Sequence, residues 1–204
     1  MNRCVILGAA PFENAAALKE YLYADDVFVA ADGGCRLAAA LGVTPVLTVA
    51  DCDSATPADV RGEWVSLPIE KDVTDTRAAL DLMYERGCRE FLLLGCLGGR
   101  LDHTIANLLS ARQLTENGAS VRLVDEKNEV TVLLPGTHTF SAEGFSVFAM
   151  GGTVGGLSMT GVQYPLENFS LSSDNPLCVS NHVTAKEATL SFANGVLLLI
   201  FSKD

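Results

Sequence analysis

The chain has 204 residues, of which 49% are hydrophobic, so it has enough apolar material for one large domain or two small ones. The formal net charge of −11 argues against nucleic-acid binding, because a nucleic-acid-binding protein must neutralise phosphates with Lys and Arg. The six cysteines include no C-x-x-C pair, so we expect reduced thiols in a cytoplasmic protein rather than zinc ligands or disulfides. No apolar stretch is long enough to span a bilayer, so we expect no membrane partner.

Residues 1–126 alternate between short apolar runs and helical patterns, which predicts a parallel sheet with crossover helices. We expect strands at 4–7, 27–31, 46–50, 64–67, 91–94 and 121–124. We expect helices at 14–23, 36–41, 70–84 and 102–115. This half of the chain is therefore predicted to form a Rossmann-like α/β domain.

Residues 127–204 lack helical periodicity and contain short β-rich runs between Gly, Pro and Asn turns. The clearest runs are 130–134, 145–148, 189–192 and 196–200. The last two flank Asn194-Gly195, which is typical of a hairpin turn, although Ala193 leaves the loop length open. We expect a small all-β domain, a β-sandwich, after the α/β domain.

Two aspartates directly follow the apolar run at 46–50. Asp51 and Asp53 would lie at the carboxyl end of a buried strand, where ligands bind in open α/β sheets. Two carboxylates so close together repel each other unless a cation lies between them, and hard oxygen ligands suit Mg²⁺. Asp and Ser are also common turn residues, so this stretch alone leaves a metal site and an ordinary acidic turn as alternatives.

A glycine-containing turn follows the predicted strand at 27–31. Asp32 precedes Gly33 and Gly34 there, and glycines allow backbone N–H groups to approach a ligand closely. Taken alone, these residue types are also those of any loop.

A further polar segment opens the predicted helix at 70–84. Lys71 at a helix N-terminus opposes the helix dipole, yet it suits an anion bound there. Asp72 or Thr74 could instead be the N-cap, and Asp75 could be a favourable first-turn charge.

A glycine loop separates the predicted strand at 91–94 from the helix that follows it. Gly98 and Gly99 lie in this loop, where backbone amides and the helix dipole would both attract an anion. Arg100 adds a fork-shaped donor that matches a phosphate group. The spacing matches neither the dinucleotide-binding fingerprint nor a P-loop.

The helix after the glycine loop begins with polar residues. Asp102 and His103 open it, and Asn107 lies one turn on from His103. His103 could act in catalysis, cap the helix or simply be solvated.

All four polar segments follow strands of one predicted sheet, so they could line one crevice. Acidic residues would hold Mg²⁺ there, while Lys71, Arg100 and glycine amides would hold phosphates. From the residues alone, we predict a Mg²⁺-dependent enzyme that acts on phosphates.

The order and spacing of these segments resemble the thiamine pyrophosphokinase family. The segments A-D-G-G, D-x-D-S, K-D-x-T-D and G-G-R-x-D-H-x-x-A-N, with a late Ser-Asn pair, carry the resemblance over essentially the whole chain. The resemblance implies Mg²⁺-dependent transfer of the pyrophosphoryl group of ATP to the hydroxyethyl group of thiamine, giving thiamine diphosphate and AMP. It also implies a homodimer, with thiamine bound between the α/β domain of one subunit and the β domain of the other.

Carried over residue by residue, the family pattern implies roles for several positions. The acids that match its Mg²⁺ ligands are Asp51, Asp53 and Asp75. Catalytic roles fall on Asp72, Arg100 and Asp102, with Asp72 or Asp102 as the group that orients or deprotonates the thiamine hydroxyl. The positions around the nucleotide are Asp32, Gly33, Lys71, Thr74, Gly98, Gly99, Arg100, His103 and Asn107. The thiamine side is represented by Ser180 and Asn181.

In the implied division of labour, residues 1–126 bind the nucleotide and Mg²⁺, and residues 127–204 bind thiamine and form the dimer. Two residues depart from the family pattern: Ala50 stands where the pattern has Gly, and Cys52 stands where a Phe is frequent. Neither departure removes a ligand.

Two other functions compete with this interpretation. A phosphatase of the haloacid dehalogenase type also uses a strand-terminal D-x-D motif, but Ala55 breaks its pattern at the fifth position. A nucleotide-sensing module without catalysis would bind ATP and form no AMP.

Overall fold

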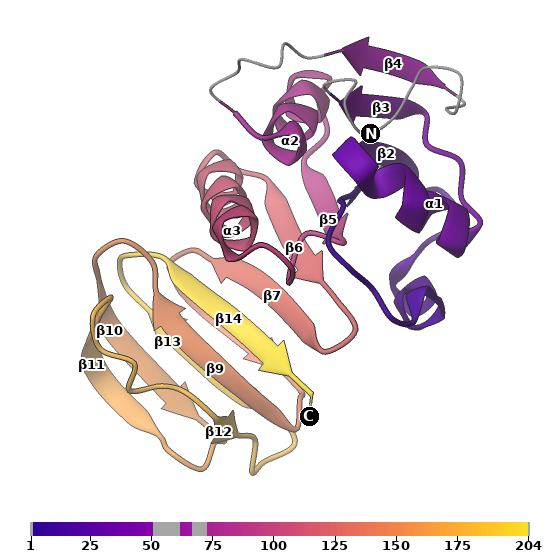
Figure 1. Ribbon diagram of the computed structural model, residues 1–204. Coiled ribbons are helices and arrows are strands. Elements are labelled where there is room, and N and C mark those ends of the chain that lie inside the picture. Colours follow the sequence, from indigo (N-terminus) through magenta and orange to yellow (C-terminus); the bar gives the residue numbers. More distant parts are fainter. Residues whose placement is uncertain (1, 51–61, 67–72, 204) are drawn as a thin grey trace. The chain divides into compact units, whose positions relative to one another are not determined.

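The computed structural model describes residues 2–50, 62–66 and 73–203. The chain divides after Glu126 into two compact units, Met1–Glu126 and Lys127–Asp204 (Figure 1). We call them the α/β unit and the β unit. No helix in the described ranges combines the length and the apolar composition needed to cross a membrane.

The α/β unit is built on a parallel sheet. Its strands are β1 (Cys4–Leu7), β2 (Val27–Ala31), β3 (Leu47–Ala50), β4 (Glu63–Ser66), β5 (Glu90–Leu94) and β6 (Ser120–Val124). They lie in the order β6-β5-β1-β2-β3-β4, and every pair is parallel. The chain proceeds outward from β1 in one direction and returns to place β5 on the other side of β1. The position between β1 and β5 is therefore a topological switch point, where open α/β sheets bind ligands.

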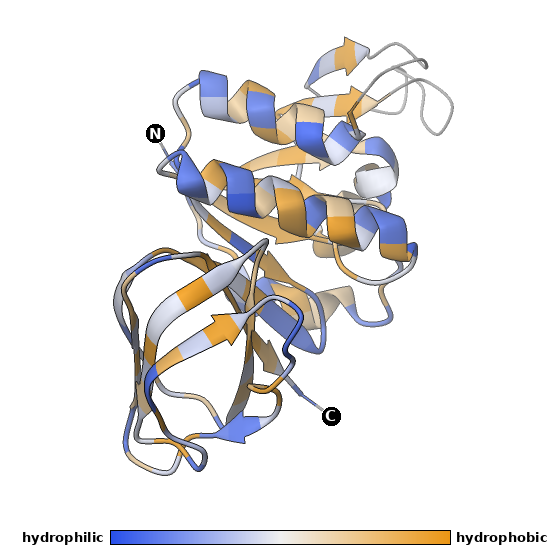
Figure 2. Cartoon of the chain, turned by 90° about the vertical axis from the view of Figure 1, so that its left-hand side faces the viewer, coloured by the Kyte–Doolittle hydropathy of each residue, from blue (hydrophilic) through white to orange (hydrophobic). Residues whose placement is uncertain are grey.

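Helices cover both faces of this sheet. They are the 3₁₀ helices η1 (Ala15–Tyr21) and η2 (Asp32–Gly34) and the α-helices α1 (Cys35–Leu41), α2 (Asp75–Glu85) and α3 (Leu101–Glu116). Figure 1 shows α1 on the opposite side of the sheet from α2 and α3, and Figure 2 shows α2 and α3 side by side. The strands β1 and β5 are apolar on both faces because both faces are covered, and their residues Cys4 to Leu7 and Phe91 to Leu94 are at most 1% exposed.

A helix is present where one was expected at 14–23, but it is a 3₁₀ helix, η1, and not an α-helix. Ala15, Leu18 and Tyr21 contact the core, and they lie three residues apart. A 3₁₀ helix has three residues per turn, so this spacing places all three on one face.

The β unit consists of two antiparallel sheets. One has the order β12 (Asn181–His182), β9 (Gly144–Ala149), β14 (Leu197–Ser202) and β7 (Asn128–Leu133). The other has the order β11 (Leu166–Ser172), β10 (Thr153–Thr160), β13 (Ala188–Phe192) and β8 (Gly136–Phe140). Buried side chains from both sheets, such as Val147 and Leu190, form one core cluster. The predicted order of an α/β domain followed by a small β-sandwich is confirmed.

The predicted C-terminal hairpin is wrong, because its two strands belong to different sheets. β13 pairs with β10 and β8, whereas β14 pairs with β9 and β7. The Asn-Gly segment carries the chain from one sheet to the other, and Asn194 accepts hydrogen bonds from the Gly155 N–H through its side-chain Oδ1 at 3.1 Å and its own carbonyl at 3.3 Å. These contacts to β10 replace the hydrogen bonds that would close a hairpin.

Candidate active site

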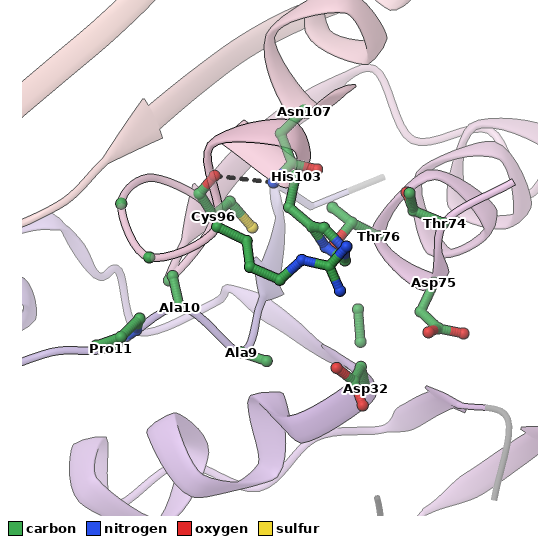
Figure 3. Close-up of a pocket in the computed structure, with 15 residues that line it drawn as sticks. Ala9, Ala10, Pro11, Asp32, Thr74, Asp75, Thr76, Cys96, His103 and Asn107 are labelled. Carbon is green, nitrogen blue, oxygen red and sulfur yellow. Dashed lines mark hydrogen bonds between the residues drawn. The ribbon is translucent and has the colours of Figure 1, made fainter. Parts of the chain in front are cut away.

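A cavity of about 570 Å³ lies at the switch point of the α/β unit (Figure 3). The segments that follow β1, β2 and β5 line it, together with the first residues of α2 and α3. The described lining residues are Ala9, Ala10, Pro11, Ala31, Asp32, Thr74, Asp75, Thr76, Gly95, Cys96, Gly98, Gly99, Arg100, His103 and Asn107. Three of the four predicted polar segments therefore contribute described residues to one cavity.

The glycine loop at residues 95–100 forms one wall of the cavity. Gly98 and Gly99 have φ values of 78° and 66°, a left-handed conformation that side chains with a Cβ rarely adopt. The loop is tied to α3, because Asn107 Nδ2 donates to the Cys96 carbonyl at 2.8 Å and Thr104 Oγ1 donates to the Gly98 carbonyl at 3.3 Å. The N-terminal end of α3 and its dipole make this wall suited to an anion.

Asn107, which is predicted to lie beside the nucleotide, lines the cavity, and its side-chain amide also holds the glycine loop. The residue is 5% exposed, and the hydrogen bond to Cys96 is visible in Figure 3. It therefore shapes the wall of the cavity by holding the loop.

Arg100 and Asp102 form an exposed ion pair at the mouth of the cavity. Arg100 Nη2 lies 2.6 Å from Asp102 Oδ2, and Arg100 Nε donates to Oδ1 at 3.1 Å. The His103 N–H also donates to Oδ1, at 2.9 Å. The hydrogen bonds from Arg100 lower the pKa of Asp102 to about 2. A carboxylate of so low a pKa is a poor general base at neutral pH, and its position suits orienting Arg100.

Two described acids, Asp32 and Asp75, line the cavity together. Asp32 directly follows β2 and has a φ of 52°, which is unusual for a residue with a side chain. Asp75 lies in the first turn of α2. Figure 3 shows both carboxyl groups at the cavity, with His103 entering it from α3.

Thr74 and Gly33 have structural tasks here. Thr74 is the N-cap of α2, because its Oγ1 accepts a hydrogen bond from the Arg77 N–H at 3.2 Å, and it also lines the cavity. Gly33 is buried in η2 and is not among the described lining residues, and a Cβ there would come within 2.8 Å of Arg36 Nη2. The second glycine of the predicted turn has a much tighter position, since a Cβ on Gly34 would lie 1.9 Å from the Leu7 carbonyl oxygen of the backbone.

The predicted residues Asp51, Asp53, Lys71 and Asp72 lie outside the described residues. Within the described ranges, no group of three or more His, Cys, Asp or Glu side chains could hold a metal ion. Two carboxylates nevertheless line the cavity, and Ala50, which ends β3, is followed in sequence by the D-x-D pair. This donor set consists of oxygen atoms and fits Mg²⁺ in chemistry.

The β unit contains a second cavity, of about 280 Å³. Its lining residues are Met159, Tyr164, Leu166, Leu177, Cys178, Val179 and Asn181. Of the predicted Ser-Asn pair, Asn181 is 2% exposed and lines this cavity, whereas Ser180 is exposed, has a φ of 56° and donates its N–H to Ser146 Oγ at 3.0 Å.

Sequence reasoning named eight of the fifteen described residues that line the first cavity, but only Asn181 in the second. Pro11 in the first cavity and Tyr164 in the second lie in segments without a charged motif, and Cys96 is an uncharged member of the glycine loop. The available signal in the β unit was a group of large apolar residues between turn residues, and three of them, Tyr164, Leu177 and Val179, are 60%, 56% and 45% exposed.

Comparison with known proteins links both units to one family. The model for the thiamin pyrophosphokinase catalytic domain matches residues 18–123, and that for the thiamin pyrophosphokinase vitamin B1 binding domain matches residues 137–197. A thiamine pyrophosphokinase of Bacillus subtilis (strain 168) is 28% identical over 214 residues, covering 100% of both chains.

Solved structures agree with this result. The crystal structure of thiamin pyrophosphokinase from Geobacillus thermodenitrificans is 32% identical, with a TM-score of 0.85 over 100% of this chain and 98% of that one. The crystal structure of thiamine pyrophosphokinase from Bacillus subtilis has a TM-score of 0.87 at 24% identity, again over 100% of both chains. The match to the catalytic domain alone spans more than half of the 204 residues. The chain therefore belongs to the thiamine pyrophosphokinase family.

Proposed function

We propose that the cavity at the switch point of the α/β unit binds the triphosphate of ATP for the reaction of this family. That reaction transfers the pyrophosphoryl group of ATP to the hydroxyethyl group of thiamine and yields thiamine diphosphate and AMP. One observation carries the proposal: the glycine loop with Arg100 and the start of α3 face the same cavity as Asp32 and Asp75. Donors for phosphate and acids for a metal are thereby combined in one place.

Arg100 is the described cation of this cavity whose geometry best suits phosphate. Its guanidinium donates two hydrogen bonds to Asp102, which favours one orientation of this side chain at the cavity. We assign it the stabilisation of charge on the transferred phosphates, together with Lys71. Gly98 and Gly99 present backbone N–H groups to the same phosphates.

We assign the Mg²⁺ ion to Asp51, Asp53 and Asp75. When bound, Mg²⁺ neutralises charge on the ATP phosphates. Asp75 supports this assignment because it lines the cavity from the first turn of α2. The variant Asp53→Asn should lose most turnover at saturating Mg²⁺, and near-normal turnover would overturn the metal assignment.

The thiamine hydroxyl attacks the β-phosphorus of ATP in line, and AMP leaves with the α-phosphate. The hydroxyl must be oriented and must lose its proton, and either Asp72 or Asp102 was expected to serve. Because both carboxylate oxygens of Asp102 accept hydrogen bonds from Arg100, we favour Asp72 for this role.

The thiamine side of the reaction is assigned to the β unit, where the vitamin B1 binding domain matches. The cavity beside Asn181 is apolar with one aromatic residue, which suits a flat heteroaromatic ring. We further propose a homodimer in which thiamine binds between the α/β unit of one subunit and the β unit of the other. We place the enzyme in the cytoplasm, where the five described cysteines would stay free thiols.

Product analysis tests the function. Incubation with ATP, Mg²⁺ and thiamine should yield AMP and thiamine diphosphate in equal amounts, and AMP should form only when thiamine is present. Formation of ADP or free phosphate would mean γ-phosphoryl transfer or hydrolysis. Tight ATP binding without turnover would instead favour a nucleotide-sensing module.

For the dimer, two impaired variants provide a direct test. At a thiamine concentration far below the KM, a mixture of Arg100→Ala and Tyr164→Ala subunits should be more active than either variant alone, if each site draws on both subunits, because one site of a mixed dimer then carries neither substitution. A mixture no more active than the two variants measured separately would contradict a shared site.

A further inference from the structure

The side chain of Asn181 makes two hydrogen bonds to the backbone of Tyr164, which lies 17 residues earlier in the sequence. Its Oδ1 accepts a hydrogen bond from the Tyr164 N–H at 3.1 Å, and its Nδ2 donates to the Tyr164 carbonyl at 3.0 Å. Oδ1 also accepts from the His182 N–H at 2.9 Å. The amide orientation follows from this pattern, because a flipped amide would face a donor with a donor and an acceptor with an acceptor.

These bonds leave Asn181 little capacity for a ligand. Its oxygen already accepts two hydrogen bonds, and one of its two N–H donors is used. The residue is only 2% exposed, and its backbone pairs with Phe145 of β9. Asn181 is therefore well placed to hold another group and poorly placed to bind a substrate itself.

The group that Asn181 holds is the turn at residues 161–164. This turn lies along residues 181–184, with the Gln163 N–H donating to the His182 carbonyl at 2.9 Å and the Thr184 N–H donating to the Gly161 carbonyl at 2.9 Å. The side chain of Asn181 extends this pairing by one residue, to Tyr164. Without it, the described backbone bonds would end at Gln163.

Tyr164 lies at the end of this turn and at the edge of the cavity in the β unit. It lines the cavity and is 60% exposed, and its hydroxyl lies 3.3 Å from Gln163 Nε2. The floor of the cavity includes Met159 and Cys178, which are 1% and 5% exposed. An exposed aromatic ring beside an apolar cavity is suited to one face of a flat, positively charged heteroaromatic ring.

We propose that Asn181 is a positioning residue that fixes Tyr164 at this cavity, and that the ring of Tyr164 contacts the ring system of thiamine. This inference rests on the proposed function, since it takes thiamine as the ligand of the β unit. It assigns substrate contact to Tyr164 and an indirect role to Asn181, so the two residues act as one unit.

A double-mutant cycle on steady-state kinetics tests this coupling. Tyr164→Ala should raise the KM for thiamine about tenfold, as expected for loss of an aromatic or cation–π contact. Asn181→Ala should raise it to a similar extent, and the double variant should be no worse than Tyr164→Ala alone. The kcat and the KM for ATP should stay within about twofold, a split that general loss of structure would not produce.

Two control variants separate the ring of Tyr164 from its hydroxyl and from general loss of hydrogen bonds. Tyr164→Phe keeps the ring and should leave the KM for thiamine unchanged. Asn194→Ala removes a side-chain acceptor of the Gly155 N–H in the same unit and should lower thermal stability without changing that KM. If Asn181→Ala does not melt cooperatively, Asn181→Asp serves in its place, because it keeps the size and sets an oxygen against the Tyr164 carbonyl.

Three results would overturn the proposal. An unchanged KM for thiamine in Tyr164→Ala would remove the ring contact. Additive effects in the double variant would mean that Asn181 contacts the substrate on its own. A wild-type enzyme that forms no thiamine diphosphate would overturn the proposed function itself, whereas normal wild-type turnover with unaffected variants would overturn only this inference.

Discussion

The hydrogen bond between Asn107 and the glycine loop offers the sharpest test of how the fold builds the phosphate site. Asn107→Ala removes the donor that holds the Cys96 carbonyl at 2.8 Å. Asn107 and Cys96 are 5% and 3% exposed, so water cannot easily replace the lost donor. The loop would keep one side-chain tie to α3, from Thr104 to the Gly98 carbonyl at 3.3 Å.

Leaving a buried carbonyl unsatisfied costs about 1–3 kcal/mol. A central value of about 2 kcal/mol lowers the folding equilibrium constant roughly 30-fold. For a unit of this size it should lower the Tm by about 4 to 10 °C. The KM for ATP should rise several-fold, because the loop carries Gly98, Gly99 and Arg100 into the cavity.

Thermal melting and steady-state kinetics with ATP would measure both effects. Thr115→Val is the matched control: Thr115 is also buried in α3, and its Oγ1 donates to the Ala111 carbonyl at 2.9 Å, far from the loop. That carbonyl lies within the helix and can keep a backbone partner, so the Tm should fall by no more than about 3 °C and the KM for ATP should not change. An Asn107→Ala variant with the kinetics and stability of this control would refute the reasoning.

Three further predictions concern the same unit. Arg100→Lys should raise the KM for ATP about tenfold in steady-state assays, because an ammonium cannot pair with a phosphate through a fork, and an unchanged KM would exclude Arg100 from the phosphate site. The pKa of Asp102 is lowered to about 2, so this carboxyl loses its charge only as the pH falls through about 2. Any fall in kcat/KM of the wild type above pH 4 should therefore come from other groups and should also occur in Asp102→Asn. If that fall is absent in Asp102→Asn, the low pKa is contradicted. Gly34→Ala would place a Cβ 1.9 Å from the Leu7 carbonyl oxygen and should destabilise the protein by roughly 2–3 kcal/mol in thermal or urea unfolding, and a stability equal to the wild type would disprove this close approach.

The α/β unit was largely predictable because its signals are local. All of β1 and residues 91–94 of β5 form continuous apolar runs, which is what a strand covered on both faces requires. The start of α3 at Leu101 was predictable because a glycine loop directly precedes it. The exception is η1, a 3₁₀ helix, because the spacing of Ala15 and Leu18 fits both a three-residue period and one turn of an α-helix.

The β unit was less predictable because sheet membership is a long-range property. The runs at β13 and β14 were recognised as strands, yet the turn between them carries the chain to the other sheet. Nothing local distinguishes such a crossing from a hairpin, because Asn194 acts through its contact with Gly155, which is 39 residues away in the sequence.

The residues of the candidate site also fall into those with a local sequence signal and those whose role depends on a distant partner. Asp32, Arg100 and His103 are polar residues in the segments that follow strands, so strand ends and residue chemistry point to them, and all three line one cavity. The tasks of the two asparagines depend on partners: Asn107 binds Cys96, and Asn181 binds Tyr164, 17 residues earlier. Both pairings arise only when the chain is folded.

Tracing the phosphorus atoms of ATP tests the central claim most directly. ATP labelled separately at the β- and γ-phosphorus would be incubated with the enzyme, Mg²⁺ and thiamine, and the products would be separated. Pyrophosphoryl transfer predicts that both labels enter thiamine diphosphate and that AMP carries neither. A γ-label in a thiamine product with the β-label left in ADP, or a γ-label in free phosphate, would contradict the account.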